Sequence, residues 1–170
     1  DVITYNALIS ACEGHQVEKA IELFAEMQWW GLEPNAITYN ALISACSKCY
    51  EVKKAMEFFA EMQQRGFTPG VITYNALISA CEKGHKVEDA MNLFTEMQQR
   101  GLIPDVITYN ALISTCGKGH KVEKAMELFA EMQQSGFEPN VITYTALISA
   151  CAKDHQVDKA MELFAEMQQS

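Results

Sequence analysis

Residues 71–79 read Val-Ile-Thr-Tyr-Asn-Ala-Leu-Ile-Ser, and this string returns almost unchanged in four other places along the 170-residue chain. Its tyrosine recurs at successive spacings of 34, 35, 35 and 35 residues: Tyr5, Tyr39, Tyr74, Tyr109 and Tyr144. A fixed period of this size is typical of repeat arrays, in which each unit buries its apolar face against its neighbours. The sequence therefore predicts five repeats, at 2–35, 36–70, 71–105, 106–140 and 141–170, the last incomplete.

Each repeat contains two amphipathic helical patterns. In the third repeat, the i, i+3, i+4, i+7 spacing of one helical face is met by Tyr74, Leu77, Ile78 and Cys81. A second apolar stripe follows at Val87, Ala90, Met91, Phe94 and Met97. Short connections between such helices favour antiparallel pairs. We therefore expect an all-α fold, an α-solenoid of stacked antiparallel helix hairpins.

Residue types at the ends of these patterns suggest how the helices begin and end. Thr73 is a candidate N-cap for the first helix of the third repeat. Gly84 is a candidate for the left-handed residue that closes it. Gly101 and Pro104 are expected to end the second helix.

Five of the six cysteines share one repeat slot and are predicted to be buried core residues of a reducing compartment: Cys12, Cys46, Cys81, Cys116 and Cys151. Cys46 and Cys49 form a single CxxC, but a metal site needs two further ligands that the sequence does not offer nearby. We expect no metal and no cofactor. No run of 18 apolar residues occurs, which excludes a membrane-spanning helix.

The first helix of each repeat has two different faces. At 100° per residue, Asn75 lies on the side away from the apolar stripe, together with Ile72 and Lys83. A polar and an apolar group repeated at a regular rise suit a surface that reads a linear polymer. The second helices are expected to be scaffold, with core residues such as Leu128, Phe129 and Met132. Their acidic residues are predicted to be solvated, as in Glu18, Glu22, Glu26, Glu123, Glu127 and Glu131.

The chain resembles the pentatricopeptide repeat family, in its P-type form with 35 residues. The resemblance lies in the period, the TYNALI opening, the Ala-Met-Glu-Leu-Phe-x-Glu-Met segment and the Gly-x-x-Pro-Asp/Asn ending, and it covers the whole chain. Tetratricopeptide repeats differ by a Trp-x-x-Leu-Gly opening that is missing from these first helices. The resemblance implies a right-handed superhelix that binds single-stranded RNA, one base per repeat. It also implies an RNA processing, stability or translation factor of mitochondrion or chloroplast.

The resemblance implies a role for four slots of the repeat. A first-helix residue and the last residue of the repeat read the base edge: Asn6 with Asn35, Asn40 with Gly70, Asn75 with Asp105, Asn110 with Asn140, and Thr145, whose partner is placed beyond Ser170. An aliphatic residue packs on the base: Ile3, Ile37, Ile72, Ile107 and Ile142. A lysine meets the phosphate: Lys48, Lys83, Lys118 and Lys153.

The paired slots predict a base order. A carboxylate only accepts hydrogen bonds, so Asp105 favours a base with a ring N–H, whereas the amides of Asn35 and Asn140 can donate to a ring acceptor. In the family, Asn with Asp goes with uracil, Asn with Asn with cytosine, and Thr with purines. With parallel binding the predicted site is 5′-C-N-U-C-purine-3′, where Gly70 leaves the second base weakly specified.

Other interpretations of these residues stay open at this stage. The asparagines could cap or solvate helices, and the isoleucines could pack between neighbouring helices. The whole array could be a protein-binding scaffold of the tetratricopeptide type, with a peptide in its groove. We find no catalytic constellation and expect no enzyme. The histidines share one slot and are expected to make contacts at a helix start: His15, His85, His120 and His155.

A net charge of −9 is unfavourable for an RNA-binding protein. However, the segments from each repeat start to the end of its first helix carry +1, and the rest of the chain carries −10. The first repeat reads Glu13-Gly14-His15 where the third reads Glu82-Lys83-Gly84-His85, so it lacks the phosphate lysine. Trp29 and Trp30 replace polar residues of the other repeats. They, or uncapped terminal repeats, are candidates for self-association.

Overall fold

The computed structural model describes residues 1–12 and 16–169, which form ten α-helices and no β-strand. The first helices of the repeats are α1 (Val2–Ala11), α3 (Ala36–Lys48), α5 (Val71–Lys83), α7 (Val106–Lys118) and α9 (Val141–Lys153). The second helices are α2 (Val17–Trp29), α4 (Val52–Gln64), α6 (Val87–Gln99), α8 (Val122–Gln134) and α10 (Val157–Met167). The first helices begin at the predicted repeat starts. The all-α solenoid of helix hairpins is thereby confirmed.

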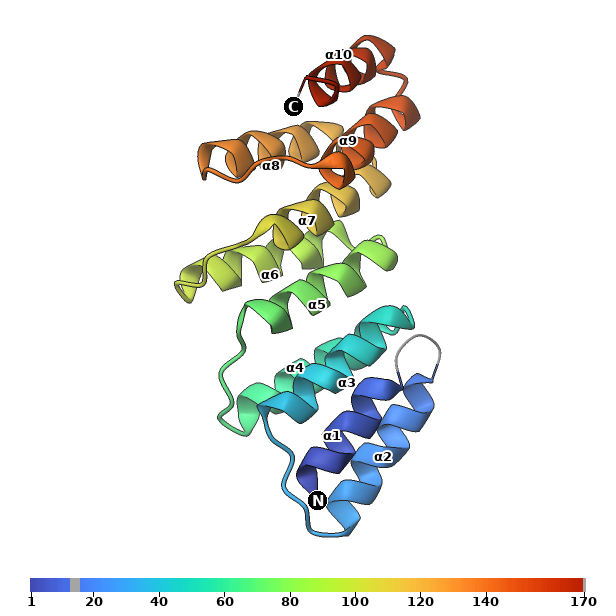
Figure 1. The fold of residues 1–170 in the computed structure, drawn as a ribbon, viewed down its shortest axis with the longest axis vertical. Helices are drawn as coiled ribbons and strands as arrows, with labels where there is room; N and C mark the ends of the chain where they lie inside the picture. Colours follow the sequence, from blue (N-terminus) through green and yellow to red (C-terminus); the bar gives the residue numbers. More distant parts are fainter. Residues whose placement is uncertain (13–15, 170) are drawn as a thin grey trace. The chain divides into compact units, whose positions relative to one another are not determined.

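The chain divides into two compact units, Asp1–Gly84 and His85–Ser170. In the first unit, α1 packs on α2 and α3, and α3 packs on α4 and α5 (Figure 1). In the second unit, α7 packs on α8 and α9, and α9 packs on α10. Within a unit, the first helices of successive repeats therefore stack directly on one another. In the first unit, α2 and α4 each lie against their own first helix and that of the next repeat, and α8 does the same in the second unit.

The predicted apolar stripes form the core. Tyr74, Leu77, Ile78 and Cys81 are fully buried on α5. On α8, Leu128, Phe129 and Met132 are buried as predicted. The predicted burial of the five same-slot cysteines is also confirmed, and none of the six cysteines, all of which lie in the described residues, forms a disulfide.

The repeat tyrosine connects its own hairpin to the preceding one. The ring of Tyr39 packs edge-on against Phe24 of the previous repeat, with ring centroids 5.8 Å apart. Its hydroxyl donates to Glu61 Oε1 of its own repeat at 2.8 Å. In the second unit, Tyr144 repeats both contacts, with Phe129 and Glu166. Burial and the Glu61 hydrogen bond both raise the pKa of Tyr39.

The first helices begin earlier than their threonines suggested. The N-cap of α5 is Gly70, and Thr73 lies at the third helical position, so the prediction that Thr73 is the N-cap was wrong. The Thr73 hydroxyl instead accepts a hydrogen bond from the Gly70 N–H at 3.2 Å. The third-position side chain is thus folded back over the helix start and satisfies one of its exposed N–H groups.

The turn between the two helices also differs from the prediction. Gly84 has φ −84°, so it does not take the left-handed conformation. That conformation falls on the next residue, His85, with φ 55°. Tyr50, His120 and His155 hold the same slot with positive φ. These residues form the turn directly before the second helix, whose N-cap in the third repeat is Lys86. The expected contact of the histidines at the helix start stays a prediction. His15 is outside the described residues.

The second helices end as predicted. Gly101 follows α6 with φ 73°, and its N–H donates to the carbonyl of Gln98. A glycine adopts this left-handed conformation without a steric penalty from a Cβ atom. The acidic side chains of α2 and α8 are exposed except Glu131, which is half-buried and accepts from the Tyr109 hydroxyl. In the described part of the chain, no helix is long and apolar enough to cross a membrane.

Candidate nucleic-acid interface

The five same-slot isoleucines are exposed on the first turn of each first helix. Their exposed fractions lie between 63% and 79%: Ile3, Ile37, Ile72, Ile107 and Ile142. Side chains so exposed are not packed between neighbouring helices, which removes that alternative. Five large aliphatic groups therefore recur in solvent at one position of the repeat.

The first-slot asparagines are less open than the helical wheel indicated. Asn6 and Asn110 are only 7% and 9% exposed, and Asn40 and Asn75 are half-buried. The expectation of an open position opposite the core is therefore corrected. The reason is the neighbouring repeat, because the start of the next first helix lies over Asn6 and Asn110. Thr145 is exposed.

The contact that covers these asparagines is a hydrogen bond from the next repeat. The Thr38 hydroxyl donates to Oδ1 of Asn6 at 2.6 Å. The Thr73 hydroxyl donates to Oδ1 of Asn40 at 2.7 Å. In the second unit, the hydroxyl of Thr143 donates to the carbonyl oxygen of Asn110 at 2.6 Å. Each asparagine is therefore held through its oxygen.

The last-slot residues are the N-caps of the following first helices. Asn35 Oδ1 accepts from the backbone N–H groups of Ile37 and Thr38, at 3.0 and 3.1 Å. Asn140 caps α9 in the same way. Asp105 Oδ1 accepts from the Thr108 N–H at 2.9 Å. The capping alternative is thus correct for this slot. The preference of N-caps for Asn and Asp could have located the helix starts from sequence.

Two of the predicted reading pairs are in direct contact. Asn6 Nδ2 donates to Asn35 Oδ1 at 3.3 Å, and Asn110 Nδ2 donates to Asn140 Oδ1 at 3.4 Å. Asn40 has no such partner side chain, because the last residue of its repeat is Gly70. Asn75 lies in the first unit and Asp105 in the second.

The predicted phosphate lysines are the last residues of their first helices. Lys48, Lys83 and Lys118 are half-buried, and Lys153 is exposed. A cation at this end of a helix is favoured by the helix dipole. The ammonium of Lys83 lies over the ring of Tyr50, 5.2 Å from its centroid. The deletion that removes the lysine from the first repeat falls among residues 13–15, outside the described residues.

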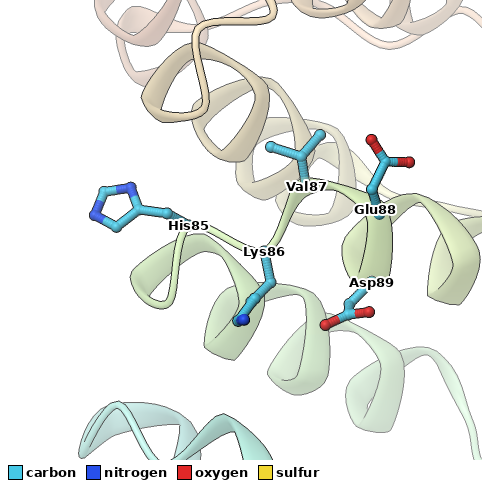
Figure 2. Close-up of a pocket in the computed structure, with 5 residues that line it drawn as sticks. All are labelled: His85, Lys86, Val87, Glu88 and Asp89. Carbon is cyan, nitrogen blue, oxygen red and sulfur yellow. The ribbon is translucent and has the colours of Figure 1, made fainter.

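Two other features lie apart from these slots. Trp29 and Trp30 are 77% and 61% exposed at the end of α2, in an edge-to-face pair with ring centroids 4.7 Å apart. A depression of about 360 Å³ at the start of α6 is lined by five consecutive residues, His85 to Asp89. Their side chains do not converge on one point (Figure 2), and none of them is a predicted reading residue.

The structure therefore defines a helical-repeat protein whose polar slots recur at fixed intervals along stacked first helices. The PPR repeat family matches at residues 1–48, 34–83, 69–118 and 104–153, and a single PPR repeat matches at residues 142–170. Together these matches cover the whole sequence. The chain belongs to the pentatricopeptide repeat family.

Solved structures agree with this assignment. The chain is 33% identical to the pentatricopeptide repeat protein PPR10 from maize, with a TM-score of 0.77 over 99% of this chain. It is 26% identical to PPR10 in complex with an 18-nt psaJ RNA element, with a TM-score of 0.81 over 91% of this chain. The chain spans about a quarter of the PPR10 length, 24% and 23% in the two structures.

A more distant similarity concerns the fold alone. The PPR domain of the Arabidopsis thaliana protein-only RNase P 1, solved in complex with tRNA, is 20% identical. Its TM-score is 0.75, over 90% of this chain and 81% of that domain. Among proteins with curated descriptions, none matches this sequence.

Proposed function

We propose that the chain binds single-stranded RNA and reads one base per repeat, with the RNA 5′ end at the first repeat. The proposed site is 5′-C-N-U-C-purine-3′. RNA binding as such is supported by family membership and by the RNA-bound structure of PPR10. The observation that supports the base order is the capping arrangement, because each last-slot side chain caps through an oxygen and the side chains then differ in their second polar atom.

In the last slot, capping uses one atom of each side chain. The oxygen of Asn35 faces the helix start, so its amide nitrogen remains as the group for a base, and it can only donate. Cytosine presents a ring acceptor on its pairing edge. Asp105 also caps through one oxygen, but its second atom is again an oxygen that can only accept. Uracil presents a ring N–H on its pairing edge, so Asp105 favours uracil. Asn140 caps like Asn35 and favours cytosine.

In the first slot, the asparagine oxygen is occupied by the next repeat. The group left for a base is therefore the amide nitrogen of Asn6, Asn40 or Asn110. The pairing edges of cytosine and uracil share the O2 carbonyl, an acceptor. In the equivalent place guanine has an amino donor and adenine a C–H group. An N–H donor in this slot thus selects pyrimidines, and exposed Thr145 leaves space for a purine.

The remaining slots contribute affinity more than sequence information. An exposed isoleucine at each helix start provides an apolar face on which a flat base can pack, and the lysines provide phosphate contacts. About 4 such contacts to a single strand give a log–log salt slope of roughly −3. By family, we place the biological role in RNA processing, stability or translation in mitochondria or chloroplasts.

The test is a change of base preference at one position. Binding to CCUCA and to CCCCA is compared for the wild type and for Asp105→Asn. The variant should move the third-base preference from U to C, by about 1–3 kcal/mol if the scale of DNA base readout applies. Stability should change little, because Asn35 and Asn140 already cap in this slot.

Two results would contradict the proposal. If both proteins bind the two RNAs equally, the array does not read bases through Asp105. If neither RNA binds while a peptide ligand does, the protein-scaffold interpretation replaces it. Thr95→Ala is a suitable control for the Asp105→Asn variant, because Thr95 lies on α6 and its hydroxyl donates to the Met91 carbonyl of the same helix.

A further inference from the structure

The threonines at the third position of α3, α5 and α9 each donate a hydrogen bond to an asparagine of the repeat before their own. We propose that each is a positioning residue that sets the base preference of that preceding repeat, which makes it an additional determinant of specificity. Thr38 would serve the first base through Asn6, Thr73 the second through Asn40, and Thr143 the fourth through Asn110. This inference rests on the proposed function.

The first step identifies the acceptor of the Thr38 hydroxyl proton. Thr38 is fully buried, and its Oγ1 accepts the backbone N–H of Asn35 at 3.1 Å. Its single proton is therefore available for one acceptor. The nearest polar atom is on the Asn6 amide at 2.6 Å, whereas Asn35 Oδ1 lies at 3.2 Å. A separation of 2.6 Å fits an O–H···O bond and is short for an N–H···O bond. The Asn6 atom is thus the carbonyl oxygen.

The second step concerns the amide nitrogen of Asn6, on the opposite side of the same amide group. Asn6 Nδ2 lies 3.3 Å from Asn35 Oδ1, to which it donates. A rotated amide would bring two carbonyl oxygens to this distance and leave the threonine proton facing an NH₂ group. Both neighbours therefore favour the same orientation. The Asn110 amide is held identically, at 2.6 Å from Thr143 and 3.4 Å from Asn140.

The third step is what this orientation does for recognition. An asparagine amide that is free to rotate presents either a donor or an acceptor, so it accommodates the O2 carbonyl of a pyrimidine and the amino group of guanine. A fixed amide presents only its N–H to the base. Discrimination against purines in the first slot therefore depends on the threonine of the following repeat.

The chain contains a matched control for this role. Thr4 has the same position in α1, and its backbone N–H and hydroxyl both bond to the N-cap Asp1. Its hydrogen-bond partner among the described residues is Asp1 and not a reading asparagine. Thr4→Val therefore removes a third-position hydroxyl without releasing a reading asparagine.

The experiment compares four RNAs that differ only at the first base and four that differ only at the third. The wild type should prefer a pyrimidine at the first base by about tenfold, within the range of single-base discrimination. Thr38→Val should reduce this preference to about twofold or less and leave the U preference at the third base intact. Thr38→Ser, which keeps the hydroxyl, and Thr4→Val should behave as the wild type.

Thr143→Val gives an independent test, because it should weaken the pyrimidine preference at the fourth base alone. Helicity and thermal unfolding of each variant show whether it is folded. Folded Thr38→Val and Thr143→Val variants that keep full pyrimidine preference at the first and fourth bases would overturn the inference, whereas the proposed function would stand. A wild type without preference at any position would overturn the proposed function and this inference with it.

Discussion

The hydroxyl of Thr143 donates a hydrogen bond to the side-chain oxygen of Asn110 at 2.6 Å, although 33 positions separate the two residues. Both residues are buried where α9 stacks on α7. The asparagine that we propose as a base reader is therefore also a contact between successive repeats. Recognition and stacking depend on the same side chain, and substitutions there should affect both.

Replacing this asparagine should lower stability as well as base preference. Asn110→Ala removes the acceptor of the buried Thr143 hydroxyl, a change that costs about 1 kcal/mol or more of unfolding free energy. Thr145→Ala is the matched control, because Thr145 has the same slot but is exposed, and such surface changes stay within about 0.5 kcal/mol. Urea unfolding followed by circular dichroism measures both. Equal stabilities would show that the hydrogen bond contributes nothing to stacking.

The salt dependence of RNA binding should report the phosphate lysines individually. Lys118 is the last residue of α7, and Lys118→Gln should make the log–log salt slope shallower by about 0.7, the value for one contact to a single strand. Lys124 on α8 is paired with Glu127 at 2.8 Å, and Lys124→Gln should leave the slope unchanged. Fluorescence anisotropy over a series of salt concentrations distinguishes the two. An equal decrease for both variants would point to general charge attraction.

The scaffold follows from the sequence because its signal is local and repeated. Tyr74, Leu77 and Ile78 occupy one face of a single helix, and their burial depends mainly on that helix and its nearest partner. Five copies of the same pattern leave little choice about which face is packed. The exposed isoleucines are predictable for the same reason, since Ile72 lies away from that stripe.

The environment of the reading residues was harder to predict because it comes from the next repeat. A helical wheel describes Asn6 relative to its own axis, but Thr38, 32 positions later, covers it. The N-cap and the closing residue of α5 were misassigned because Thr and Gly both suit several terminal positions. Only the contacts of the Thr73 hydroxyl and the backbone angles of His85 decide between them.

Stability should fall at alkaline pH because buried thiols resist ionisation. Burial raises the pKa of Cys46 from 9.0 to about 12, so the folded chain keeps a proton that the unfolded chain loses. This contribution is complete below pH 9 and decreases by about 1.4 kcal/mol per pH unit as the pH rises from there toward about 12. Cys46→Ala should flatten this decrease in urea unfolding under reducing conditions. Cys49→Ala, at the half-buried end of α3, is the comparison.

The glycine in the second reading pair offers a gain of specificity. Gly70 is the N-cap of α5 with φ −110°, an extended conformation open to any residue, and a Cβ atom there meets nothing within 4 Å. Gly70→Asp should therefore cap α5, adding a few tenths of a kcal/mol of stability, and create a preference for U at the second base of about 1–3 kcal/mol. Gly70→Asn should favour C instead, and Gly70→Ala should favour neither. Binding to RNAs that vary only at the second base tests all three, and identical profiles for Asp and Asn would show that this slot caps the helix without reading the base.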